Sequence, residues 1–150
     1  MERSSVPLLV AADVKIVGLG KDQLTIDGDV NVDGVGDTRH FDVNAGKTLM
    51  MSGLTLTNGY ASEGTSGGSI YSDGTLVLSD CVLSNNRAGV DGGAIYASAS
   101  SPSVTLTDCL VTQSVAFDRG GGVIQLGGPL LIDHTELVGN SATTGDGGGI

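Results

Sequence analysis

Four polar residues near the start of the chain have the types and spacing of a calcium-binding loop. They are Asp29, Asn31, Asp33 and Asp37. Alternating oxygen ligands, with Gly34 at the sharp bend, suit a hard divalent cation such as Ca²⁺. The twelfth position of the loop, however, holds His40 in place of a bidentate glutamate, and no helices are predicted to flank it. An ordinary acidic turn between strands is the competing interpretation.

A second pair of carboxylates, Asp80 and Asp108, recurs at one position of a sequence repeat. Two carboxylates stacked at one corner can hold calcium for a polysaccharide lyase, in which an Arg or Lys removes the proton beside a uronate carboxylate. The aligned positions hold Gly53 and His134, so no base is predicted there. Turn-forming aspartates that accept backbone N–H groups are the structural alternative. With only two histidines, the chain also offers no convincing catalytic triad.

The composition excludes several classes of partner. The 150 residues carry a net charge of −10 with only seven Lys and Arg, which argues against nucleic acid and bare anionic membranes. No apolar run approaches the roughly 18 residues of a membrane helix, and no signal peptide is visible. Twenty-five glycines, no Trp and 3% aromatic residues are typical of a repetitive all-β architecture.

The chain repeats itself at intervals of 26 to 28 residues. Four segments align without a gap: TLMMSGLTLTNGYA (48–61), TLVLSDCVLSNNRA (75–88), SVTLTDCLVTQSVA (103–116) and PLLIDHTELVGNSA (129–142). Each is followed by a glycine pair and an aliphatic residue: GGSI (67–70), GGAI (92–95), GGGV (120–123) and GGGI (147–150). A period of this length is typical of solenoids, whose coils bury their apolar side chains only against neighbouring coils.

Each repeat contains two short runs of alternating apolar and polar residues, separated by a two-residue corner such as Ser79–Asp80. This period of two predicts strands, and the residue after the glycines begins a third strand. Coils stacked about 4.8 Å apart in parallel register place Leu76 beside Val104 and Ile95 beside Val123. Since parallel connections prefer the right hand, we predict an all-β, right-handed, single-stranded parallel β-helix of about five to six coils.

The whole chain is then one domain, residues 1–150. Its parts are N-terminal coils at 1–47 and repeats at 48–74, 75–102, 103–128 and 129–150.

Equivalent positions of neighbouring coils should form ladders. We expect three such rows: the polar row Asn86, Ser114 and Asn140, the thiol pair Cys81 and Cys109, and the charged row Asp91, Arg119 and Asp146. Amides and hydroxyls in the polar row can hydrogen-bond from coil to coil. The thiols should stay reduced and buried, because parallel Cβ vectors suit the dihedral of a disulfide poorly. Alternating charges in the third row should favour the correct register.

The repeats resemble a known family. The glycine-pair motifs, together with an aliphatic residue, two others, Asn, one more and Ala at 83–88 and 137–142, are similar to the repeats of chlamydial polymorphic outer-membrane proteins. Such repeats also occur in secreted bacterial β-helix proteins of the pectin-lyase-like class. The resemblance covers roughly residues 14–150. The chain departs from it where the usual Phe is Leu56, Leu83, Val111 or Leu137, and where Gly59 and Ser114 replace the Asn.

This resemblance implies an exported domain in the cell envelope, at the outer membrane, or outside the cell, and we expect the chain to be a segment of a longer protein. Two classes of function follow. One is a structural or adhesive surface module that binds a surface glycan or a host or cell-surface protein through its faces and turn loops. The other is a calcium-dependent polysaccharide lyase of the pectate-lyase type. Uncovered coil ends also predict end-to-end self-association.

Overall fold

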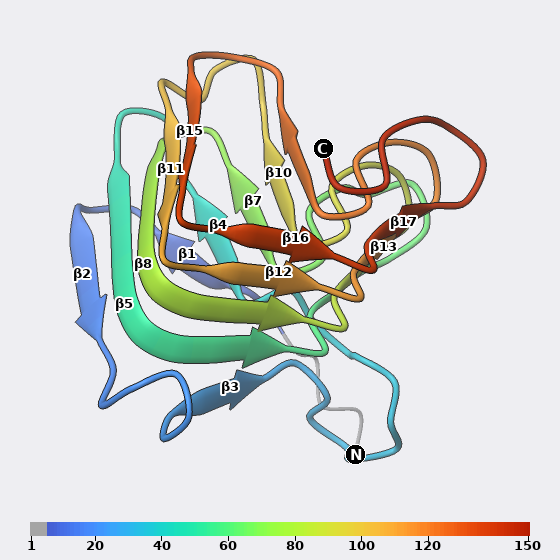
Figure 1. Ribbon diagram of the computed structural model, residues 1–150, viewed down its shortest axis with the longest axis horizontal. Coiled ribbons are helices and arrows are strands. Elements are labelled where there is room, and N and C mark those ends of the chain that lie inside the picture. Colours follow the sequence, from blue (N-terminus) through green and yellow to red (C-terminus); the bar gives the residue numbers. More distant parts are fainter. Residues whose placement is uncertain (1–5) are drawn as a thin grey trace.

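The alternating segments of the repeat fold into short strands that all pair in parallel (Figure 1). The computed structural model describes residues 6–150, and this part of the chain contains strands, turns and bends but no helix. The predicted N-terminal segment 1–47 therefore begins with five residues that lie outside the described part. No segment of residues 6–150 forms a helix that could cross a membrane.

The strands form three parallel sheets. Sheet A contains β1 (Leu8–Val10), β4 (Phe41–Val43), β7 (Ile70–Ser72), β10 (Ile95–Ala97) and β14 (Val123–Gln125). Sheet B contains β2 (Val14–Val17), β3 (Thr25–Asp27), β5 (Thr48–Thr57), β8 (Thr75–Ser84), β11 (Val104–Thr107), β12 (Leu110–Thr112), β15 (Leu130–Asp133) and β16 (Glu136–Val138). Sheet C contains β6 (Tyr60–Ala61), β9 (Arg87–Ala88), β13 (Val115–Ala116) and β17 (Ser141–Ala142).

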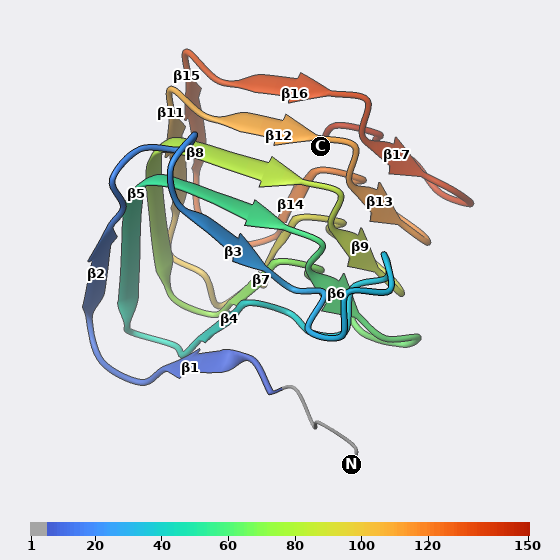
Figure 2. The same cartoon turned by 90° about the horizontal axis from the view of Figure 1, so that it is seen from below.

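Each turn of the chain passes through sheets A, B and C in that order and then rises to the next level (Figures 1 and 2). The result is the predicted right-handed parallel β-helix. It makes about four complete turns rather than five to six, because sheet C has only four strands while sheet A has five. In the first turn, the loop 28–38 takes the place of a sheet C strand, and Tyr60 N donates to Thr38 O at 3.0 Å.

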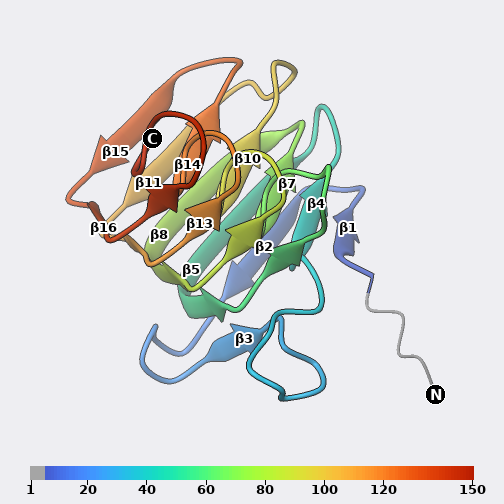
Figure 3. The same ribbon diagram turned by 90° about the vertical axis from the view of Figure 1, so that its right-hand side faces the viewer.

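The register predicted from the repeat is confirmed. Leu76 pairs with Val104, and Ile95 pairs with Val123. Like residues therefore meet like residues on adjacent strands, and their apolar side chains stack into continuous rows inside the helix. Figure 3 shows the strands of successive turns lying side by side along the axis.

The core is built only from these rows. Its fully buried members include Leu49, Leu56, Leu78, Ile95 and Leu106. Burying one such side chain stabilises the fold by about 1.5–3 kcal/mol. The inward positions of β2 and β15, in the first and last turns, are only partly buried, because they have a neighbouring coil on one side alone. The middle turns therefore carry most of the hydrophobic stabilisation.

Three corners per turn are made by single residues with positive φ. The first corner row is Gly53, Asp80, Asp108 and His134, the second is Asn58, Asn85, Gln113 and Gly139, and the third is Gly67, Gly92, Gly120 and Gly147. Gly, Asn and Asp tolerate this left-handed conformation better than other residues do. In the two-residue corner expected at Ser79–Asp80, Asp80 is the residue that adopts positive φ, and at the second corner Asn85, next to Asn86, does so.

Candidate functional site

The middle residue of each three-residue strand in sheet A points outward, because side chains alternate between the two faces of a strand. Parallel pairing lines these residues up in one row on the surface. The row is Leu9, Asp42, Tyr71, Tyr96 and Ile124. Two tyrosines thus meet on neighbouring strands in the middle of an exposed face.

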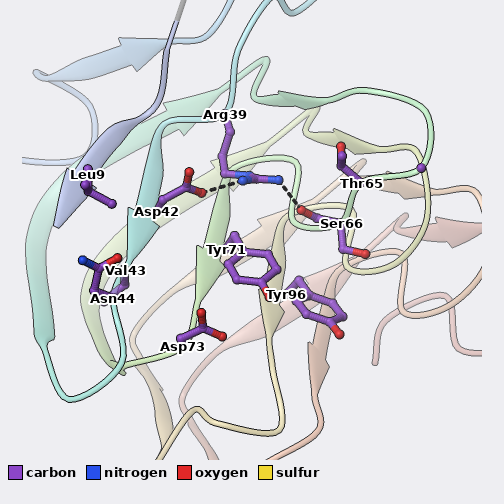
Figure 4. A pocket seen from close by; sticks show the side chains of 11 residues that line it. Leu9, Arg39, Asp42, Val43, Asn44, Thr65, Ser66, Tyr71, Asp73 and Tyr96 are labelled. Atoms are coloured by element: carbon purple, nitrogen blue, oxygen red, sulfur yellow. Dashed lines mark hydrogen bonds and ion pairs between the residues drawn. The ribbon is translucent and has the colours of Figure 1, made fainter. Parts of the chain in front are cut away.

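The rings of Tyr71 and Tyr96 stack, with their centroids 5.2 Å apart and their planes at 23°. The guanidinium carbon of Arg39 lies 5.3 Å from the centre of the Tyr71 ring, as Figure 4 shows from close by. Stacked rings and a cation over a ring face are both favourable arrangements of π systems. Arg39, Tyr71 and Tyr96 therefore form one continuous stack.

Arg39 is fixed in this stack by three interactions. Figure 4 shows the two that join it to Asp42 and Ser66. Its Nε donates to Gly67 O at 2.7 Å, and its Nη2 donates to Ser66 O at 2.6 Å. Its Nη1 makes an ion pair with Asp42 Oδ1. A guanidinium with three fixed partners holds the neighbouring ring in place, so the stack is preorganised.

A groove of about 470 Å³ lies against this stack. Its polar lining includes Arg39, Asp42, Asn44 and Asp73, and the loop at 64–66 closes one side. Asp73 Oδ1 also accepts a hydrogen bond from Ser98 Oγ at 2.5 Å. Burial, with a smaller contribution from Asp73, raises the pKa of Tyr71, so its hydroxyl stays protonated. We name this surface the tyrosine groove. It combines aromatic rings with fixed acceptors of hydrogen bonds.

Most of the aromatic side chains lie on the surface of the helix. Of the five aromatic side chains, only Phe41 belongs to the core. The three tyrosines and Phe117 line grooves on the outside. Large aromatic side chains normally stabilise cores, and this chain fills its core with aliphatic residues instead.

The predicted calcium loop is held together by its own carboxylates. Asp29 accepts hydrogen bonds from the backbone N–H of Val32, Asp33 and Gly34 at 2.7 to 3.2 Å. Asp37 accepts from the backbone of residues 30 and 31 and from the side chain of Asn31. In residues 6–150 no three His, Cys, Asp or Glu side chains are grouped so that they could hold a metal ion. Calcium binding by Asp29, Asn31, Asp33 and Asp37 stays a prediction.

Asp80 and Asp108 lie at the same corner of adjacent turns, as their alignment predicts, and both have positive φ. The expectation that no Lys or Arg lies beside this corner is wrong. Lys21, from the loop between β2 and β3, places its Nζ 2.8 Å from Asp80 Oδ1. The hydrogen bond to Asp80 raises the pKa of Lys21, so its amine is held in the protonated form. A protonated amine cannot remove a proton from a substrate.

The polar row of Asn86, Ser114 and Asn140 connects side chains to backbone rather than side chains to one another. Asn86 is fully buried, and its Oδ1 accepts a hydrogen bond from Gly59 N, in the turn before, at 2.8 Å. Asn140 Oδ1 accepts from Ser114 N at 3.0 Å, and Asn140 Nδ2 donates to Val111 O at 2.8 Å. These bonds link successive turns at the second corner, where the backbone is not paired by regular strands.

Cys81 and Cys109 are buried free thiols, as expected. A hydrogen bond between the two thiols, together with burial, raises the pKa of Cys81. The charged row forms only in part. Arg119 binds the buried Asp91 through Nη2 at 2.7 Å and makes a longer contact of 3.7 Å with Asp118. The expected partner Asp146 contributes no ion pair among the described residues.

Sequence reasoning missed the tyrosine groove. The only available signal was that Tyr71 and Tyr96 each follow the aliphatic residue after a glycine pair, in GGSIY and GGAIY. Alternation places such a residue outside the helix. The role of Arg39 had no signal in the sequence, because the carbonyls that fix its guanidinium, those of Ser66 and Gly67, lie in a loop of the next turn.

Comparison with known proteins agrees with this architecture. No curated protein and no solved structure gives a significant match to the chain. The family model of the Chlamydia polymorphic membrane protein repeat matches residues 80–98, which run from the corner at Asp80 through β9 and β10. The chain is thus a parallel β-helix that carries a repeat of the Chlamydia polymorphic membrane protein type.

Proposed function

We propose that the chain is an exported, surface-displayed β-helix module that binds a glycan in the tyrosine groove. The single observation that carries this proposal is the stack of Arg39, Tyr71 and Tyr96 on the outward face of sheet A. The repeat at residues 80–98 supports a location in the cell envelope, since its family consists of chlamydial membrane proteins.

The groove has the chemistry that a sugar needs. The C–H face of a pyranose ring packs against an aromatic ring, while its hydroxyls require hydrogen-bond partners placed around that ring. Asp42, Asn44 and Asp73 supply oxygen acceptors beside the rings, and the protonated hydroxyl of Tyr71 supplies a donor. A shallow groove of this kind suits an exposed saccharide better than a small apolar metabolite, which needs an enclosed cavity.

Tyrosine fluorescence offers a direct test, because the chain has three tyrosines and no Trp. The protein is titrated with hits from an oligosaccharide array, and the affinity is confirmed by calorimetry. We expect Tyr71→Ala and Tyr96→Ala each to weaken binding about tenfold or more, since each removes half of the aromatic surface. Met50→Ala is the matched control, because Met50 is an exposed apolar residue on sheet B.

Absence of any saccharide binding, or binding that both tyrosine variants leave unchanged, contradicts the proposal. A calcium-dependent rise in ultraviolet absorbance on polygalacturonate would favour the lyase instead. Circular dichroism of each variant shows whether a loss of binding reflects a loss of folding.

A further inference from the structure

A second groove lies on the outward face of sheet C, separate from the tyrosine groove. It has a volume of about 320 Å³, and its lining includes Tyr60, Glu63, Arg87, Gly89, Val115 and Phe117. Parallel pairing places Tyr60, Arg87 and Val115 side by side on β6, β9 and β13. We name this surface the arginine groove.

The shape of the arginine groove depends on a glycine. A Cβ added at Gly89 would lie 2.3 Å from the carbonyl oxygen of Ser62 in the turn before, so no side chain fits there without moving backbone. The glycine lets the backbone at Ser62 and Glu63 approach this closely, and Glu63 then lines the groove together with Tyr60 and Phe117. Phe117 is 59% exposed, so its ring is accessible to a ligand that enters the groove.

Arg87 differs from the other arginines that the structure describes. Arg39 pairs with Asp42, and Arg119 pairs with Asp91, whereas Arg87 makes no ion pair within residues 6–150. Glu63 lines the same groove but does not bridge to Arg87. In a chain of net charge −10, an exposed guanidinium without a carboxylate partner, beside Tyr60 on one strand and Val115 on the other, is a position where an external anion can bind.

We infer that the arginine groove binds a carboxylate-bearing sugar, such as a uronic or sialic acid residue at the end of a glycan. The guanidinium of Arg87 would bind the sugar carboxylate through two parallel hydrogen bonds, while the apolar face of the ring packs against Phe117 or Tyr60. A guanidinium and an aromatic ring that line one groove require a ligand with both an anion and a flat apolar face, and an acidic sugar has both.

An extended peptide is a poorer fit to this groove. Peptides that bind sheets usually add a strand to an unpaired edge. The floor of the arginine groove is made by β9 and β13, which are paired on both sides, to β6 and β17 as well as to each other. No backbone edge is available there, so recognition rests on the side chains alone.

This inference does not depend on the tyrosine groove. The two grooves lie on different sheets, and no residue lines both. Tyr71→Ala and Tyr96→Ala should therefore leave binding at Arg87 unchanged, and the two proposals can fail separately.

Calorimetry with two matched probes tests the inference on the full chain. We expect 3′-sialyllactose and trigalacturonate to bind at least about tenfold more tightly than lactose, which lacks a carboxylate. Arg87→Gln should remove this preference, and Arg87→Lys should restore part of it, because lysine keeps the charge but not the bidentate geometry. Glu63→Gln should strengthen binding of the acidic probes, since it removes a like charge from the groove.

Lys15→Gln is the control for net charge, because Lys15 is an exposed cation on sheet B and lies outside both grooves. It should leave the affinity unchanged. Equal affinity for lactose and the acidic probes, or an acidic preference that survives Arg87→Gln, would overturn the inference. An acidic peptide that binds more tightly than 3′-sialyllactose and trigalacturonate would also overturn it.

Discussion

Along one inward row of sheet A every residue is apolar, whereas the outward row beside it changes from acidic to aromatic to aliphatic. The inward row is Phe41, Ile70, Ile95 and Val123. The outward row beside it is Asp42, Tyr71, Tyr96 and Ile124. Both rows have the same backbone spacing and the same hydrogen bonds. The repeated side therefore determines the fold, while the side that varies from turn to turn determines what the surface can bind.

We expect the largest difference in stability between two substitutions in β8, one of an inward residue and one of an outward residue. Leu78 is fully buried, and its neighbour Val77 points outward. We expect Leu78→Ala to lower the free energy of unfolding by about 2–5 kcal/mol, because the coils cannot close the cavity. Val77→Ala should cost less than about 1 kcal/mol. Urea denaturation measures both, and equal losses would mean that the two sides are not distinct.

The buried His40 should make the stability of the fold depend on pH. His40 is 7% exposed, and its Nδ1 lies 2.9 Å from Ser69 Oγ. Burial lowers its pKa from 6.5 to about 4, although the carbonyls of Thr57 and Ile26 oppose the shift. The unfolded chain therefore binds a proton at higher pH than the folded chain does. The stability that the buried, neutral His40 contributes is complete above pH 6.5 and is lost as the pH falls towards 4.

This loss amounts to at most about 3–4 kcal/mol, since the pKa falls from 6.5 to about 4 and each unit corresponds to about 1.4 kcal/mol. Urea denaturation at pH 7, 5.5 and 4.5 measures it. The exposed His134 is the control, and His134→Gln should keep the pH dependence, whereas His40→Gln should flatten it. An NMR titration of the two imidazoles checks the same point in the unaltered protein. A His40 that titrates near 6.5 would contradict the buried environment.

We expect only a small loss of stability from a substitution in the exposed loop at 28–38. Asp29→Ala removes an acceptor for three backbone N–H groups in an exposed loop, and we expect it to cost about 1 kcal/mol in urea denaturation. Calorimetric titration of chelator-treated protein with calcium decides between the two interpretations of the loop. Heat that Asp29→Ala and Asp33→Ala abolish identifies a calcium site. Absence of heat, with the loss of stability alone, identifies an acidic turn.

The same contrast explains how much could be predicted from the sequence. The pairings of Leu76 with Val104 and of Ile95 with Val123 were predictable, because a row that must be apolar in every turn leaves a periodic pattern. Sheet C was missed, because strands of two residues are too short to show alternation.

The contacts of the candidate sites were harder to predict from the sequence, because some of their residues lie outside the repeat. Lys21 and Arg39 lie outside the four aligned segments, so the repeat contains no information about their partners. The aspartates at the first corner were predicted, since turns favour Asp. The ion pair of Asp80 with Lys21, however, depends on a loop of the first turn that reaches past the second turn to the third. The repeat determines the position of its own residues and not of the residues that wrap around it.

The loops that connect sheet C to sheet A suggest how such a protein can change. The loop between β6 and β7 is two residues longer than the loops between β9 and β10 and between β13 and β14. Ile70 nevertheless pairs in register with Ile95, so the extra length is accommodated on the surface without disturbing the next strand. Evolution or an engineer can therefore exchange these loops one at a time and obtain a new specificity on an unaltered scaffold.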